Sequence, residues 1–443
     1  MDILSLLPQF GSLLWTILAF VAALSIIVAV HEYGHYIVGR WSGIHADVFS
    51  LGFGPVLFSG TDRRGTVWQV AALPFGGYVK FRGDANAASA PDGQVVAEMT
   101  AAQRRTTMAG APLWARTATV AAGPVFNFIL AIVIFTVVGM ARGEVAEPLT
   151  VKDLRPLPIE HGLQEGDILL AIDGRPVPPL AEFATLRDSL EPAPLLAMTV
   201  ERDGRRIEID GPWLWPAIAT SFQPQSPAIR GGMQVGDIIT GVDGAPVFNF
   251  DQLLERVNTG EGAAMELEIF RNGDSLALTL APRVVDDPLP EGGFRQVYRL
   301  GIMGGIAFVP ETETKGLGRA FVDGVSTTYG VIERSITGLW AMITRTISSC
   351  NISGPLGIAE VSGQMASMGG WSFLFFLGVL SVAVGFLNLF PIPVLDGGHL
   401  VFFAYEAVTG KPPSDRAMQI LMTTGLVIIL TLMVFALSND IFC

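Results

Sequence analysis

Four long runs of apolar residues, two toward each end of the chain, dominate its hydrophobic pattern. They lie at roughly 12–38, 117–140, 371–390 and 418–437. Each is long enough for one helix to cross a hydrocarbon core, which needs about 20 mostly apolar residues. The first run lacks the basic start and small-residue cleavage site of a signal peptide, so we expect a retained span. The pattern predicts a multi-pass α-helical membrane protein with four transmembrane helices.

Between the second and third runs, short apolar stretches alternate with turn residues. LQEGDILLAIDGRPV at 163–177 recurs 70 residues later as MQVGDIITGVDGAPV at 233–247, with eight of fifteen positions identical. Each copy has a Gly-Asp turn, a strand, an Asp-Gly turn and a second strand, and a helix-like stretch follows. The repeat predicts two α+β domains, which we bound at 142–222 and 223–312.

The GDxIxxxDGxPV pattern of both copies resembles PDZ domains, whose exposed strand and groove accept an extended peptide. Two small spacer domains without a ligand are the alternative. Residues 316–350 interleave apolar with charged residues and are too polar for a clean span. We predict amphipathic juxtamembrane helices at 313–353. The first two spans with their loop then occupy 1–141, and the last two occupy 354–443.

Composition and charge agree with a membrane protein. Half of the 443 residues are hydrophobic, 16% are charged, and the mean hydropathy is +0.48, which is unusual for a soluble domain. The net charge is −13, and residues 142–315 carry 15 Lys and Arg against 27 Asp and Glu, with 13 against 14 elsewhere. No basic stripe of the kind that nucleic-acid binders carry is present, so nucleic acid is excluded as a partner.

The basic residues of the short loops predict the direction of the spans. The loop between spans one and two carries Arg40, Arg63, Arg64, Lys80, Arg82, Arg104, Arg105 and Arg116, and the loop between spans three and four carries Lys411 and Arg416. Both loops should face the cytoplasm. The acidic central block and both chain ends then lie on the other side.

The first apolar run ends in a polar motif, HEYGH, at 31–35. On a helix, His31 and His35 share a face and can hold one metal ion together. Glu32 follows the first ligand and can act as general base toward a metal-bound water. Imidazole nitrogens suit Zn²⁺, which works in catalytic sites with three protein ligands and an open position. Ionisable groups at this depth are costly without pairing or a metal.

The third ligand must come from elsewhere in the chain. Asp396, in NLFPIPVLDGGHL, is the only carboxylate between Glu360 and Glu406, and the predicted topology brings it to the same side as His31. His399 is the rival ligand. The prolines at 391 and 393 cannot continue a helix, so span three should open before Asp396.

At these motifs the chain resembles the site-2 protease family of intramembrane zinc metalloproteases and, within it, the bacterial RseP group. The resemblance extends over essentially the whole length, and its pieces are HEYGH (31–35), LPFGGYVKFRGD (73–84), AGPVFNF (122–128), the tandem PDZ-like repeats, GPLGIA (354–359) and NLFPIPVLDGGH (388–399). The resemblance implies that His31, His35 and Asp396 bind one zinc ion and that Glu32 is the catalytic base.

The resemblance also implies an inner-membrane endopeptidase of regulated intramembrane proteolysis, with its PDZ-like domains in the periplasm and its active site toward the cytoplasm. Its partners are then membrane lipids, transmembrane protein or peptide substrates, and peptide or protein ligands of the PDZ-like domains. The family's best-known substrates are anti-sigma factors and remnant signal peptides, and no motif indicates which of them this chain cleaves.

A helical substrate must be unwound before its carbonyls can be attacked, and unwound backbone in lipid needs new partners. The stretch 66–83 has strand-like residues around Pro-Phe-Gly-Gly and predicts a β-hairpin that dips toward the site, with Gly76 and Gly77 available to substrate backbone. In the family a membrane-associated β-loop occupies this place. An ordinary cytoplasmic hairpin is the alternative.

Two amides complete the candidate residues. Asn388 could hold substrate backbone or orient the site, or form an interhelical hydrogen bond. Asn127, in span two, we expect to support the site.

Two other functions compete with proteolysis. One is a non-enzymatic scaffold or chaperone with a structural metal, although only three good ligands are visible. The other is a metal transporter, although spans two and four lack ionisable residues.

Overall fold

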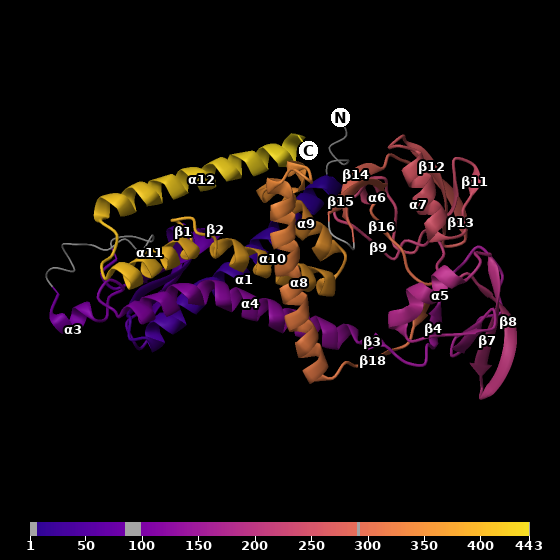
Figure 1. The fold of residues 1–443 in the computed structure, drawn as a ribbon, viewed down its shortest axis with the longest axis horizontal. Helices are drawn as coiled ribbons and strands as arrows, with labels where there is room; N and C mark the ends of the chain where they lie inside the picture. The colour runs from indigo at the N-terminus through magenta and orange to yellow at the C-terminus, as the bar shows by residue number, and fades with distance from the viewer. Residues whose placement is uncertain (1–6, 85–98, 290–292, 443) are drawn as a thin grey trace. The chain divides into compact units, whose positions relative to one another are not determined.

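The computed structural model describes residues 7–84, 99–289 and 293–442, and these fall into two compact units (Figure 1). The helical unit comprises residues 1–139, 317–345 and 349–443, and the β-rich unit comprises 140–316 with 346–348. The predicted boundary at 141/142 lies within three residues of the division between the units.

Helices build most of the helical unit. They are α1 (Leu7–Trp41), α3 (Ala101–Arg104), α4 (Leu113–Arg142), α8 (Leu317–Ile343), α9 (Pro355–Ser367), α10 (Gly370–Asn388), α11 (Asp396–Thr409) and α12 (Asp415–Phe442). Among the described residues four helices are long and apolar enough to cross a membrane, within α1, α4, α10 and α12. The prediction of four apolar helices that are long enough to span a membrane is confirmed. Helix α8 is not among them, because charged residues interrupt its apolar positions.

Helices α1 and α4 lie side by side, and small residues bring their backbones together (Figure 1). A Cβ atom on Gly34 of α1 would lie 2.6 Å from the backbone oxygen of Ala122 on α4, so only glycine fits there. Helix α10 joins this core, where the Ser381 hydroxyl donates to the backbone oxygen of Asn127 at 2.8 Å. The three helices thus meet at the depth of HEYGH.

Strands β1 (Ala46–Thr61) and β2 (Val67–Phe81) form an antiparallel pair that folds back on itself. Phe49 of β1 pairs with both Trp68 and Val79, so the two halves of β2 lie on either side of β1. The hairpin predicted within 66–83 was therefore misplaced. This stretch forms the single bent strand β2, and the hairpin joins β2 to the preceding strand β1. Glycine and proline within β1 concealed that strand in the sequence.

The β-rich unit contains two four-stranded sheets of matching order, β6-β5-β7-β8 and β11-β10-β12-β13. The first comprises β5 (Ile168–Ile172), β6 (Arg175–Pro176), β7 (Leu195–Arg202) and β8 (Arg205–Pro212), with the 3-10 turn η2 (Leu180–Glu182) and α5 (Phe183–Ser189). The second comprises β10 (Ile238–Val242), β11 (Ala245–Pro246), β12 (Met265–Arg271) and β13 (Asp274–Leu280), with α6 (Pro227–Arg230) and α7 (Phe250–Thr259). The sequence repeat is therefore a repeat of structure.

The repeated residues explain why both sheets form. The Asp of each Gly-Asp turn is buried and pairs with an Arg at the end of a strand, Asp167 with Arg202 at 2.7 Å and Asp237 with Arg271 at 2.6 Å. Each Asp-Gly turn begins with an aspartate at positive φ, 45° at Asp173 and 51° in the second copy. Aspartate and glycine tolerate this conformation, which tight hairpin turns require.

The remaining strands of this unit form two-stranded pairs outside the four-stranded sheets. They are β3 (Glu144–Val145), β4 (Val151–Leu154), β9 (Ser221–Phe222), β14 (Arg283–Pro288), β15 (Phe294–Arg299), β16 (Ile302–Met303), β17 (Phe308–Pro310) and β18 (Thr312–Glu313). Strand β17 pairs with β4 and β18 with β3, and Phe308 is buried in the first core. Ala217 and Phe222 already belong to the second core. The predicted limits at 222/223 and 312 therefore differ from the cores, because the first core is completed by chain that follows the second.

Candidate metal centre

The HEYGH motif begins about three turns before the end of α1, and its histidines share one helix face. Their Nε2 atoms are 3.2 Å apart, and the rings stand edge to face with centroids 4.8 Å apart. Residues four apart on a helix are neighbours on its surface, so this convergence follows from the spacing alone. Both rings are largely buried within the helical unit.

Asp396 is the first residue of α11 and reaches the same point from a distant part of the chain. Its Oδ2 lies 3.1 Å from Nε2 of His31, and its Oδ1 lies 3.5 Å from Nε2 of His35. Helix α10 ends at Asn388, and the two prolines of the following turn prevent it from continuing. The chain thereby turns and starts a new helix at Asp396. Ligand atoms of the three residues all lie within 4.8 Å of one another.

A glycine of α4 makes room for the two imidazoles. A Cβ atom on Gly123 would collide with Nε2 of His35 and would lie 2.7 Å from Cε1 of His31. Any side chain at this position would therefore displace both rings. Gly123 belongs to the AGPVFNF motif of α4, so this motif contacts the histidines directly.

The second ring nitrogen of His35 fixes its tautomer. Nδ1 lies 2.9 Å from the backbone oxygen of Thr119 on α4. A carbonyl oxygen can only accept, so Nδ1 carries the proton and Nε2 keeps a free lone pair. Hydrogen bonds of this kind orient metal-ligating histidines in proteins. The sequence did not indicate Thr119, because it acts through its backbone oxygen and every residue type has one.

Asn127 contacts the other histidine. Its Nδ2 lies 3.2 Å from Nδ1 of His31, while its Oδ1 is buried without a hydrogen-bond partner in the described part of the chain. Ligation through Nε2 requires the proton on Nδ1, which then needs an acceptor. A half turn of the amide brings Oδ1 to that position. Asn127 can therefore orient His31 for metal binding.

The three side chains fit a zinc ion. Oδ2 of Asp396 is buried and accepts no hydrogen bond from the described residues, although a buried carboxylate oxygen is normally satisfied. Two neutral imidazoles and one carboxylate are donors that zinc accepts, and three protein ligands leave the fourth position that catalytic zinc sites keep open. The unsatisfied oxygen and the two free Nε2 lone pairs thus point to a cation.

Glu32 lies between the cluster and the β1–β2 pair. Its carboxyl group accepts a hydrogen bond from the backbone of Val79 on β2. A Cβ atom on Gly77 would lie 3.2 Å from Cγ of Glu32, so β2 passes close to this side chain. The predicted base and the predicted glycine are therefore neighbours in the structure.

The remaining candidates lie around the cluster. Gly76 has a φ of 137°, and a Cβ there would lie 2.5 Å from the Phe53 ring. The amide of Asn388 donates to the backbone oxygen of Val384 on its own helix at 3.1 Å. His399 stands edge to face with Phe402 and is not part of the described cluster of ligand atoms.

Comparisons with known proteins find zinc metalloproteases. The model of the family described as Peptidase family M50 matches residues 19–432. A protein of Agrobacterium fabrum named "Putative zinc metalloprotease" is 34% identical over 440 residues, which cover 97% of either chain. A Rhizobium meliloti protein with the same description is 35% identical over 432 residues, again 97% of either chain. The regulator of sigma-E protease RseP of Salmonella typhimurium is 32% identical over 461 residues, 97% of this chain and 99% of its own.

Proposed function

The chain belongs to peptidase family M50, the site-2 protease family, and on this premise we propose that it is an intramembrane endopeptidase. It is a membrane protein and a zinc metallopeptidase. The proposed reaction is the hydrolysis of peptide bonds within the transmembrane segments of single-span proteins. The convergence of His31, His35 and Asp396 among apolar helices carries this proposal.

In the proposed mechanism, His31, His35 and Asp396 hold zinc, and Thr119 and Asn127 orient the imidazoles. When bound, zinc supplies a Lewis acid that polarises a carbonyl oxygen and makes water acidic enough to lose a proton near neutral pH. Glu32 takes that proton and delivers it to the amide nitrogen of the leaving peptide.

The substrate backbone has to be unwound and held. Hydrogen bonds that a helical segment loses in lipid need replacement. Strand β2 passes next to Glu32 at Gly77 and Val79, and among the described strands the second half of β2 pairs with β1 alone, along one edge. We assign its other edge to the substrate, which adds as a further strand.

The proposed location is the bacterial inner membrane. The basic loops support an active site toward the cytoplasm and a β-rich unit in the periplasm. There the two PDZ-like domains bind peptide segments and control which proteins reach the site. The resemblance to the site-2 protease family suggests substrates of the anti-sigma factor or remnant signal peptide type, and one relative is named a regulator of sigma-E protease.

The test is cleavage of a panel of purified single-span proteins by the full-length protein in lipid vesicles, with mass spectrometry of the fragments. We expect cuts within the membrane segment that a zinc chelator abolishes. Glu32→Gln should keep zinc and lose activity by about a thousandfold, since a general base contributes about 10²–10⁴-fold. Glu333→Gln, the same change at an exposed position on α8, is the matched control.

Two results would contradict the proposal. One is full activity of Glu32→Gln, which removes the assigned base. The other is cleavage confined to segments outside the membrane, which leaves a zinc peptidase without an intramembrane role.

A further inference from the structure

Helix α11 begins with Asp396, but most of its length packs only loosely against the rest of the protein. Beyond its first turn only Phe402 is buried, whereas Val401, Tyr405 and Val408 are exposed. The first turn is held by close backbone packing: a Cβ atom on Gly397 would collide with the backbone oxygens of the preceding turn. The direction of the helix axis therefore depends on contacts made farther along it.

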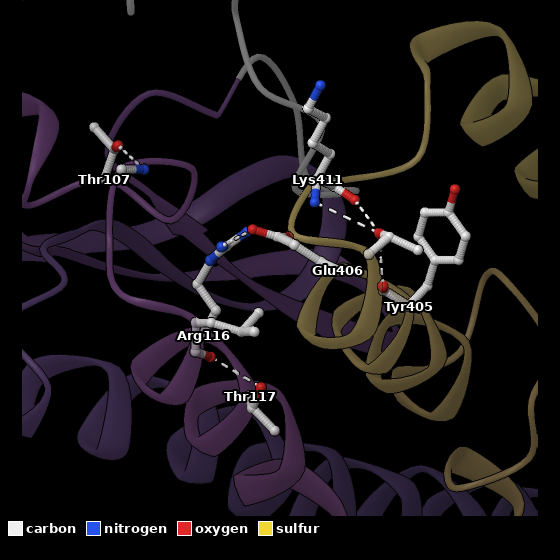
Figure 2. A network of polar contacts seen from close by, with 9 residues as sticks. Thr107, Arg116, Thr117, Tyr405, Glu406 and Lys411 are labelled. Carbon is white, nitrogen blue, oxygen red and sulfur yellow. Dashed lines mark hydrogen bonds and ion pairs between the residues drawn. The ribbon is translucent and has the colours of Figure 1, made fainter.

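One such contact is an ion pair that joins α11 to α4 (Figure 2). Nη2 of Arg116 lies 2.6 Å from Oε1 of Glu406, and Nη1 lies 3.0 Å from Oε2, so the pair is bidentate. The side chains are 15% and 18% exposed. The guanidinium also lies over the Phe403 ring, 5.3 Å from its centroid. Two residues of α11 that lie three positions apart, on one helix face, thus hold one arginine of α4.

The position of Arg116 on α4 connects this pair with the metal centre. Arg116, Thr119, Gly123 and Asn127 are spaced by three, four and four residues and share one face of α4. The last three contact His31 or His35. One face of α4 therefore holds both histidines and, through Arg116, the far end of the helix that starts with Asp396.

We propose that Arg116 and Glu406 are positioning residues that set the axis of α11 and thereby hold Asp396 against His31 and His35. A bidentate arginine–carboxylate pair constrains direction as well as distance, which suits this task. The alternative is that the pair only neutralises two charges near the membrane. The proposal rests on the proposed function in one respect, that the cluster binds zinc.

The test is the zinc affinity of the full chain in detergent, measured by competition with a chromophoric chelator. We expect Glu406→Gln and Arg116→Gln each to weaken zinc binding by about tenfold, the lower end of the range for residues that orient metal ligands. The double variant Arg116→Gln/Glu406→Gln should be as weak as either single variant. Affinity restored in the double variant would overturn the proposal, because relief of an unpaired charge would then explain the single variants.

A cycle with Asp396 tests whether the pair acts through that ligand. In an Asp396→Asn background, Glu406→Gln should cause no further loss of zinc affinity, since coupled residues are not additive. An independent tenfold loss there would overturn the proposal. If the glutamine variants do not fold, Arg116→Lys keeps the charge but loses the second hydrogen bond, and a loss of about threefold is expected. Unchanged affinity in Arg116→Lys would then overturn it.

The control is Asp440→Asn. Asp440 of α12 accepts hydrogen bonds from the backbone nitrogens of Gly354, Leu356 and Gly357, and these bonds join α12 to the start of α9 rather than to α11. Its zinc affinity should equal that of the wild type, and an equal loss in this control would overturn a specific role for the pair. Wild-type protein that binds no zinc would refute the proposed function. If the wild type binds zinc and Glu406→Gln binds it with the same affinity, only this inference is refuted.

Discussion

Buried carboxylates occur in both units, and their surroundings differ. In the β-rich unit, Asp167 and Asp237 are fully buried, and each accepts a bidentate arginine and a backbone N–H. In the helical unit, Asp396 faces two histidine nitrogens, and its Oδ2 accepts no hydrogen bond from the described residues. The carboxylates of Asp167 and Asp237 have their hydrogen-bond partners within the fold. The carboxylate of Asp396 has an oxygen left for a bound cation.

The difference separates residues that stabilise the protein from residues that serve a ligand. A satisfied buried charge is costly to disturb, because its partner is left unpaired. An unsatisfied one costs stability in the absence of its ligand, and function is a common reason for such a cost. Substitutions of the same kind at the two places should therefore have opposite consequences.

The largest effect is expected for Asp396→Asn. Loss of one of three zinc ligands removes several kcal/mol of transition-state stabilisation, or about a thousandfold in cleavage rate. The unfolding free energy of the metal-free protein should change by less than about 1 kcal/mol, because no hydrogen-bonded partner is lost. Cleavage assays and denaturant unfolding in the presence of a chelator measure the two quantities. A large loss of metal-free stability would break the comparison.

The reverse is expected for Asp167→Asn. Arg202 loses its charged partner, and the unfolding free energy of the β-rich unit should fall by about 2–3 kcal/mol. Zinc content should be unchanged. Asp210→Asn, at an exposed position of the same domain, is the control and should stay within about 0.5 kcal/mol. Equal stability of Asp167→Asn and the control would show that the buried pair does not stabilise the fold.

A smaller effect is expected at the amide beside His31. Asn127→Ala removes the group that orients this ring, so zinc affinity should weaken by about tenfold. Asn388→Ala is the matched control, because its amide donates to its own helix. Chelator competition measures both variants. Zinc affinity that is weakened only in Asn388→Ala would reverse the roles assigned to the two amides.

The smallest effect is expected at His161, which corresponds to Gly231 in the second repeat. Burial lowers the pKa of His161 below its usual value. The unfolded chain therefore binds a proton more readily, and the stability of the first domain should fall as the pH drops below about 6.5. The loss should be a fraction of that in Asp167→Asn. His161→Gln should remove it, and an unchanged pH profile in this variant would exclude His161 as its source.

Much of this architecture could be predicted from the sequence. The four spans follow from length and apolarity, and the meeting of His31 with His35 follows from helical spacing. The Gly-Asp and Asp-Gly turns predicted both sheets of the repeat, because their residue types tolerate few other conformations. Asp396 could be chosen because a carboxylate at the end of a span is rare and costly.

Other features have no local signal. Strand β1 contains Gly52 and Gly54 at positive φ, which bend it and weaken its strand pattern. Thr119 acts through its backbone oxygen. Arg116 and Glu406 are 290 residues apart, and only the tertiary fold shows that they are partners. Such contacts depend on how whole elements pack, so residue type alone does not reveal them.

The return of the chain at Phe308 has a consequence for synthesis on the ribosome. The second core contains residues from Ala217 to Leu300, so it is complete soon after those residues emerge. The first core, although it starts earlier, lacks Phe308 and its pairing strand β17 until later. The domain that is translated second can therefore fold first. The earlier domain can complete its core only after β17 has been synthesised.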